Sequence, residues 1–147
     1  MVTAIQRSAL LPYTAEQMYQ LINQVEAYPQ YLDGCVGAEL ISQSESHMEA
    51  RLDLAKAGLN YSFITRNTLT PNSKVVMELV DGPFNKLNGR WLLTPLSEEA
   101  CKVSLELEYE FSNKMFDLAF GRIFNHLTNN MVQAFILRAK DVYGVKV

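Results

Sequence analysis

The last third of the chain carries one long amphipathic helix pattern, which follows a series of short strand patterns. From Lys114 to about Val142, apolar residues recur at spacings of three and four, as in a helix with one buried face. This apolar stripe comprises Phe116, Ala119, Phe120, Ile123, Phe124, Leu127, Met131, Phe135, Ala139 and Val142. A stripe this bulky needs a large apolar surface to pack on, and the preceding strands are the candidates for it. The pattern therefore predicts an α+β fold in which a curved antiparallel sheet holds one long helix.

Seven strand-like runs precede the helix. Apolar and polar residues alternate most clearly in His47–Lys56 and Cys101–Phe111. Further strands are expected at Thr3–Leu11, from Gly37 onward, and at 59–66, 74–81 and 90–95. Gly58 and the segment 71–73 supply turns between successive runs, which predicts hairpins in an antiparallel meander. The segment 81–89 contains two glycines and a proline, and we expect it to be an irregular loop.

Two short helices are expected between the first two strands. Thr14 and Gln17 have the spacing of a capping box ahead of an apolar periodic segment, which predicts a helix over about 15–23. Pro29 lies near the start of a second helical segment of one or two turns, which Asp33 and Gly34 end.

Length and charge limit the class of protein. A chain of 147 residues is predicted to form a single domain over 1–147. The 13 Lys and Arg residues against 16 Asp and Glu give a net charge of -3, which argues against a dedicated nucleic-acid-binding protein and predicts no DNA partner, although it is compatible with a local basic patch. The chain has no run of eighteen apolar residues, and its first eleven residues lack the features of a secretory signal. These features predict a cytoplasmic protein.

No motif for metal binding or catalysis is present. Cys35, Cys101, His47 and His126 are isolated in the sequence, so we expect two reduced thiols and no metal site. Neither histidine belongs to a nucleophile motif, and no glycine-rich phosphate loop follows a strand. We expect the glutamates at 106, 108 and 110 to lie on a solvated sheet face. The sequence therefore predicts a protein that is not an enzyme and has no cofactor.

Four segments resemble a known family in the same order along the chain. They are 28–35, 84–91, 105–111 and 131–144. Together they resemble the START-like superfamily branch that contains the coenzyme Q-binding proteins and the bacterial ribosome-association toxin, also described as oligoketide cyclases. The resemblance spans nearly the whole chain. It implies a helix-grip fold with an apolar cavity between the sheet and the C-terminal helix.

Apolar residues that face the cavity implied by the resemblance are candidate ligand-binding residues. An ordinary filled core would bury the same residues. Those expected to line the cavity are Leu52, Leu54, Tyr61, Phe63, Met77, Leu79, Trp91, Leu93, Leu107, Tyr109, Phe120, Phe124, Leu127, Met131 and Phe135. In the segment 81–89, Phe84 and Leu87 are expected to form an exposed portal or to complete the core.

The resemblance implies three functions. The first is a carrier that binds a hydrophobic small molecule, ubiquinone or a related quinone or lipid, and supports respiration, with transient contact to a membrane surface. The alternative is a toxin that binds the large ribosomal subunit and blocks subunit joining. The third is a polyketide cyclase or dehydrase, which would need an acid or base inside the cavity, and the expected lining offers only tyrosines for that role.

Overall fold

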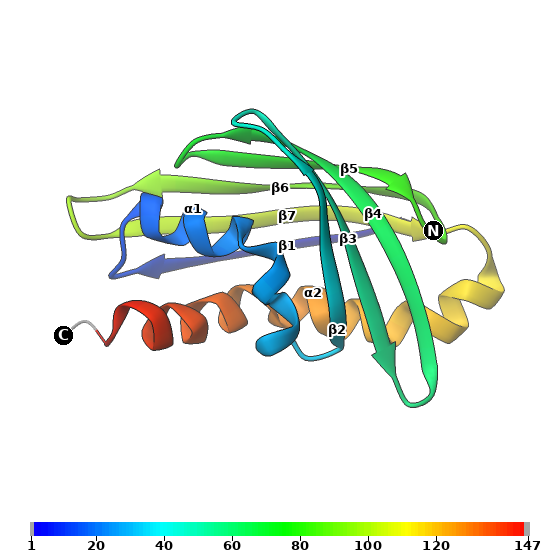
Figure 1. Ribbon diagram of the computed structural model, residues 1–147. Helices are drawn as coiled ribbons and strands as arrows, with labels where there is room; N and C mark the ends of the chain where they lie inside the picture. The colour runs from blue at the N-terminus through cyan, green and yellow to red at the C-terminus, as the bar shows by residue number, and fades with distance from the viewer. Residues whose placement is uncertain (1, 146–147) are drawn as a thin grey trace.

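The computed structural model describes residues 2–145 as one antiparallel sheet with helices packed on it. The strands lie in the order β1-β7-β6-β5-β4-β3-β2. They are β1 (Thr3–Leu11), β2 (Cys35–Gln43), β3 (His47–Lys56), β4 (Leu59–Thr70), β5 (Lys74–Asp81), β6 (Phe84–Pro95) and β7 (Cys101–Phe111). The helices are α1 (Ala15–Asn23), the 3₁₀ helix η1 (Val25–Gln30) and α2 (Lys114–Tyr143). The sheet curves around α2 (Figure 1), so the predicted helix-grip fold is confirmed.

Helix α2 begins and ends at the residues that its flanking signals indicate. Asn113 is its N-cap, and the Asn113 Oδ1 atom accepts a hydrogen bond from the Phe116 backbone amide at 2.8 Å. Gly144 follows the last turn with a φ of 87°, a conformation that glycine adopts easily. The periodic pattern therefore predicted the helix to within one residue of its observed end.

The buried face of α2 agrees with the predicted stripe except in the last turn. Most of the stripe is buried or packs against the core, but the Val142 side chain is 46% exposed. In the final turn Ala139 is fully buried, and the Tyr143 hydroxyl donates a hydrogen bond to the Gln17 backbone carbonyl at 2.9 Å. Contact with α1 therefore sets the orientation of this turn and leaves Val142 in solvent. The prediction that Val142 belongs to the buried face is wrong.

The capping box predicted for α1 is present. The Thr14 hydroxyl accepts a hydrogen bond from the Gln17 backbone amide at 3.1 Å, and the Gln17 side chain accepts one from the Thr14 amide at 2.9 Å. The Tyr13 hydroxyl donates to the Gly144 carbonyl at 2.7 Å, which ties the start of α1 to the end of α2. The two helices thus close one end of the curved sheet.

Strand β6 corrects the prediction of an irregular loop over 81–89. The strand begins at Phe84, and its pairing with β7 starts at Phe111. Gly82 has a φ of 151°, and a Cβ atom at this position would lie 2.7 Å from Phe63 Cβ. Gly82 and Pro83 therefore form a short turn rather than part of a long loop. The other glycine of the segment, Gly89, lies inside the strand.

Aromatic rings fill most of the space between α2 and the sheet. The Phe124 ring lies 4.6 Å from Tyr109 and 5.1 Å from Phe84, measured between ring centroids. Further along α2, the Phe135 ring lies 5.3 Å from the Trp91 ring at an interplanar angle of 89°. Such edge-to-face contacts add to the stability gained from burial.

Candidate functional site

A small interior cavity of about 70 Å³ lies between the sheet and α2. A cavity of this volume has room for only a few water molecules. Pockets for drug-sized ligands are typically about 300–1,000 Å³. A larger guest would therefore enter only if side chains moved. The thioether side chains of Met77 and Met131, which line the cavity, are the ones best suited to moving.

The expected ligand-binding residues divide into two groups in the structure. Those that line the cavity are Leu52, Phe63, Met77, Trp91, Leu107, Phe124, Leu127 and Met131. The others pack in the surrounding core without lining the cavity: Leu54, Tyr61, Leu79, Leu93, Tyr109, Phe120 and Phe135. The cavity wall also contains residues that were not anticipated, namely Val25, Tyr28, Ala50, Thr65, Asn67, Leu105 and Thr128.

Asn67 is the unexpected polar residue in this wall. Its side chain is 7% exposed, and its Oδ1 atom has no hydrogen-bond partner among the described residues. By contrast, the Thr128 hydroxyl donates to the Phe124 carbonyl at 2.9 Å. An unpaired buried amide oxygen costs about 1–3 kcal/mol, so this position favours a donor such as water or a ligand hydroxyl. Asn67 occupies an inward position of the alternation in β4, and that polar interruption was the signal that could have identified it.

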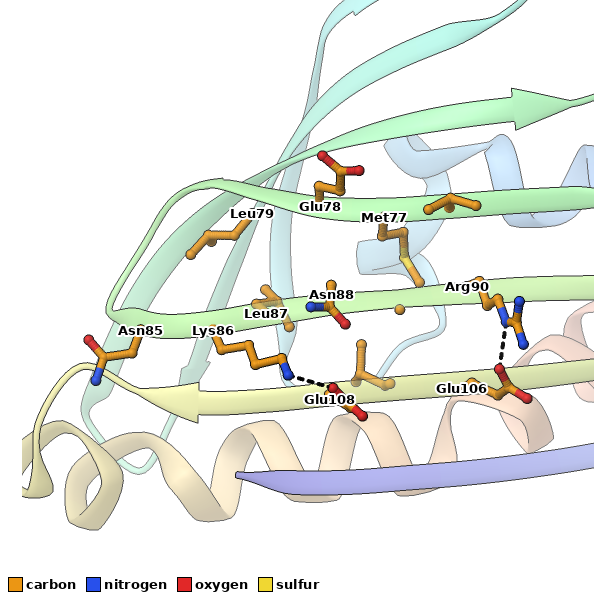
Figure 2. Close-up of a pocket in the computed structure, with 13 residues that line it drawn as sticks. Met77, Glu78, Leu79, Asn85, Lys86, Leu87, Asn88, Arg90, Glu106 and Glu108 are labelled. Atoms are coloured by element: carbon orange, nitrogen blue, oxygen red, sulfur yellow. Dashed lines mark hydrogen bonds and ion pairs between the residues drawn. The ribbon is translucent and has the colours of Figure 1, made fainter. Parts of the chain in front are cut away.

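A larger cleft opens on the outer face of the sheet, where β5 and β6 separate. The two strands pair only from Lys74 with Leu92 to Glu78 with Asn88. Beyond this segment, β5 continues its pairing with β4, and β6 continues with β7. The space between them forms a cleft of about 720 Å³ (Figure 2).

The cationic side chains of the cleft are already paired. Lys86 Nζ lies 2.7 Å from Glu108 Oε2, and Arg90 Nε lies 2.5 Å from Glu106 Oε2 (Figure 2). These glutamates lie on the solvated face of the sheet, as predicted. Since carboxylates neutralise both cations, the cleft is not suited to binding an anion.

A wall one side chain thick separates the outer cleft from the interior cavity. Met77, Leu87 and Leu107 line both spaces. Gly89 lies opposite Met77 in the β5–β6 pairing and contributes no side chain to the wall. Met77, whose unbranched side chain is flexible, is therefore the part of this wall best suited to moving.

Phe84 and Leu87 do not form an exposed loop tip. Both are 6% exposed and belong to strand β6. The Phe84 ring stacks on the Phe111 ring at a centroid distance of 4.6 Å, and Leu87 lies in the wall described above. Pairing with β7 turns both side chains toward the core, so of the two alternatives the structure agrees with completion of the core and not with an exposed portal.

Titratable side chains lie both in the buried core and on the surface of the described residues. In the core beside the cavity, burial raises the pKa of Tyr61, whose hydroxyl has no hydrogen-bond partner among the described residues. On the surface, His126 Nε2 lies 3.0 Å from Asp33 Oδ2, which also accepts a hydrogen bond from Lys56 Nζ at 3.3 Å. The contacts with Lys56 and His126 hold the pKa of Asp33 below its usual value. The exposed Asp33–His126 pair joins α2 to the segment before β2.

The next feature is the arrangement of the cysteines and of the side chains that could bind a metal ion in the described part of the chain. Residues 2–145 contain no group of three or more His, Cys, Asp and Glu side chains placed to bind a metal ion. Cys35 and Cys101 are free and buried, and burial raises the pKa of each thiol to about 11. No helix within this range is long and apolar enough to cross a membrane.

Comparison with known proteins gives a family match and close relatives. A family model described as polyketide cyclase/dehydrase and lipid transport matches residues 11–136. The chain is 54% identical over 142 residues to the ribosome association toxin RatA of Escherichia coli, covering 97% of this chain and 90% of that protein. RatA of Vibrio cholerae is 56% identical over 140 residues, covering 95% and 97%. The mitochondrial coenzyme Q-binding protein COQ10 of Dictyostelium discoideum is 25% identical over 142 residues, covering 91% and 67%.

Solved structures share the fold at low sequence identity. A START superfamily protein from Mycobacterium smegmatis superposes with a TM-score of 0.75 at 21% identity, covering 95% of this chain and 98% of that one. The Zhui aromatase/cyclase from Streptomyces gives a TM-score of 0.77 at 13% identity, covering 95% and 94%. At these identities the likeness concerns the fold alone.

Proposed function

The chain belongs to the polyketide cyclase/dehydrase and lipid transport family, and from its likeness to the RatA proteins we propose that it associates with the ribosome. The observation that carries this proposal is 54% identity sustained over 97% of the chain. The matched segment includes both the sheet and α2.

The geometry supports a role for the exterior of the molecule. The interior cavity of about 70 Å³ is too small for a long ligand without rearrangement. A ribosome-binding protein needs only an exposed surface and a stable scaffold. The aromatic contacts of Phe124 and Phe135 supply that stability.

Sedimentation tests the proposal. Purified protein is mixed with separated small and large ribosomal subunits and centrifuged through sucrose gradients at graded salt. We expect co-migration with the large subunit at low salt and a smaller fraction of joined ribosomes when both subunits are present. Absence of co-migration with either subunit at low salt would overturn the proposal.

A second candidate function is the binding of a hydrophobic molecule in the interior. Two observations favour it: the unpaired Asn67 oxygen in an otherwise largely apolar wall, and the thin barrier at Met77 between cavity and cleft. A distant relative, 25% identical, is named a coenzyme Q-binding protein. A quinone or another lipid with one polar end is the class of ligand that these features suit.

Extraction of purified protein with organic solvent, followed by mass spectrometry, tests this second function. A stoichiometric quinone or prenyl lipid is the expected result. The variant Ala50→Leu is the matched control, because Ala50 lines the cavity and the larger side chain would fill it. Ligand that persists in Ala50→Leu, or an extract without lipid from the unmodified protein, would contradict binding at this site.

A further inference from the structure

The exposed face of α2 lacks carboxylates. Residues 118–140 contain no Asp or Glu, although the whole chain has 16 of them. The acidic residues Asp117 and Asp141 stand just outside this stretch. The exposed side chains within it form one helical stripe: Leu118, Arg122, Asn125, His126, Asn130, Gln133, Leu137 and Lys140. We call this stripe the α2 outer face.

The cations on and beside the α2 outer face are not neutralised. Arg122, Arg138 and Lys140 have no described carboxylate within 4.0 Å, whereas Lys86 and Arg90 on the sheet are both paired. The carboxylate that does reach this face, from Asp33, is shared between Lys56 and His126. A protein of net charge -3 thus presents a local cationic surface rich in amide groups.

A shallow groove runs beside this stripe. It has a volume of about 220 Å³ and lies between Tyr31, Leu32 and Asp33 on one side and His126, Asn130, Gln133 and Leu137 on the other. At its margin, the Arg138 guanidinium carbon lies 5.0 Å from the centroid of the Tyr31 ring. The described hydrogen bonding of that guanidinium is one long contact of 3.4 Å to Gln30 Oε1.

We propose that the α2 outer face binds the phosphate backbone of RNA and that the groove beside Tyr31 receives an unstacked base. This inference rests on the proposed ribosome association and identifies the surface and the chemistry that carry it. Arg and Lys neutralise phosphates, and Asn and Gln donate to phosphate and sugar oxygens, whereas carboxylates on such a face would repel the RNA. Unpaired RNA bases stack on aromatic rings and on guanidinium planes, which Tyr31 and Arg138 provide.

The same observations disfavour a lipid membrane as the partner of this face. A helix that lies in a membrane surface needs a continuous apolar side. On the α2 outer face, the exposed leucines Leu118 and Leu137 stand near opposite ends, and amide side chains occupy the turns between them.

The test compares two double variants with the same change in net charge. Arg122→Glu with Lys140→Glu alters the α2 outer face, and Lys74→Glu with Lys102→Glu alters two cations on the opposite face of the sheet. None of these four cations has a described carboxylate within 4.0 Å. Binding to the large subunit and to a short fluorescent oligoribonucleotide of ribosomal sequence is measured over a range of salt concentrations.

We expect the α2 variant to bind RNA at least about tenfold more weakly, with a salt dependence shallower by about one to two in log–log slope. The sheet variant should stay within about twofold of the unmodified protein. An equal loss of RNA binding in both variants, or unchanged RNA binding by the α2 variant, would overturn the inference and leave the ribosome proposal intact. If the unmodified protein does not bind subunits at all, the ribosome proposal fails, and the oligoribonucleotide measurement decides the inference by itself. Thermal unfolding of all variants controls for folding.

Discussion

Leu107 packs its side chain directly against the backbone of Gly89, across the pairing of β6 with β7. A Cβ atom at position 89 would lie 2.7 Å from Leu107 Cδ1 and 2.5 Å from the Glu106 carbonyl oxygen. The carbonyl belongs to a paired strand and cannot move easily, so Gly89→Ala should destabilise the protein by about 1–3 kcal/mol. Urea unfolding measures this loss as a lower midpoint.

Gly121→Ala is the matched control for Gly89→Ala. Its Cβ atom would approach only the Asp117 carboxylate, at 3.0 Å, and that side chain is exposed and flexible. Alanine is favoured over glycine inside a helix by about 1 kcal/mol, so this variant should be neutral or more stable. Equal destabilisation by both substitutions would contradict the packing at Gly89.

The ion pair of Asp33 predicts a pH dependence of stability. Lys56 and His126 lower the pKa of Asp33 in the folded protein. The ion pair therefore contributes fully to folding stability above the pKa of the unfolded state, 3.8, and this contribution is lost as the pH falls through the pKa of the folded state. Because the pair is exposed, Asp33→Asn should cost less than about 1 kcal/mol at neutral pH. The difference between the two proteins should vanish below the folded pKa and shrink in high salt. A difference that persists in strong acid would point to another cause.

Two residues of the predicted helix stripe should respond differently to truncation. Phe135 is 1% exposed and contacts the Trp91 ring, so Phe135→Ala should cost about 3–5 kcal/mol. Val142 is 46% exposed, and Val142→Ala should change stability by less than about 0.5 kcal/mol. Chemical denaturation of both variants checks the orientation of α2, and a large effect at Val142 would show that the last turn is misplaced.

The buried thiols predict a loss of stability in alkali. Burial raises the pKa of Cys35 and of Cys101 from 9.0 to about 11, so the unfolded chain releases these protons at lower pH than the folded protein. The contribution of the two thiols to folding stability is therefore complete below pH 9.0 and is lost as the pH rises toward about 11. Native protein at neutral pH should also react slowly with a thiol reagent. The double variant Cys35→Ala with Cys101→Ala should show a smaller alkaline loss, and an identical loss would assign it to the tyrosines.

The capping box allows a test of local stability. Thr14→Ala removes the acceptor of the Gln17 amide and should cost about 1 kcal/mol, whereas Thr14→Ser retains the hydroxyl and should cost much less. Thermal unfolding distinguishes them. Equal effects would mean that the methyl group of Thr14, rather than its oxygen, stabilises α1.

The architecture could be predicted from the sequence because its signals are local. Alternation in Cys101–Phe111 and the spacing of apolar residues after Asn113 each depend on neighbouring residues, and both elements are observed. The start of β6 could not be predicted in the same way. Glycine and proline near Phe84 resemble a loop, whereas Gly89 is needed inside the strand because Leu107 occupies the space of a side chain.

The candidate sites depend on packing, which a pattern does not contain. The alternation of apolar and polar residues correctly predicted that Phe63 and Leu107 point inward. It could not show that aromatic rings leave an interior cavity of only about 70 Å³. The unpaired oxygen of Asn67 and the separation of β5 from β6 likewise follow from three-dimensional arrangement. The cations on and beside the α2 outer face could be recognised as one surface only because the structure shows the apolar side of α2 packed against the sheet.

The short pairing between β5 and β6 also has a mechanical consequence. Five residue pairs join these strands, from Lys74 with Leu92 to Glu78 with Asn88, whereas β6 and β7 are joined along most of their length. This short pairing lies between a unit of β1, β7 and β6 and a unit of β2 to β5. Transient parting at this seam would make the amide hydrogens of β5 that face β6 exchange with solvent sooner than those at the centre of either unit.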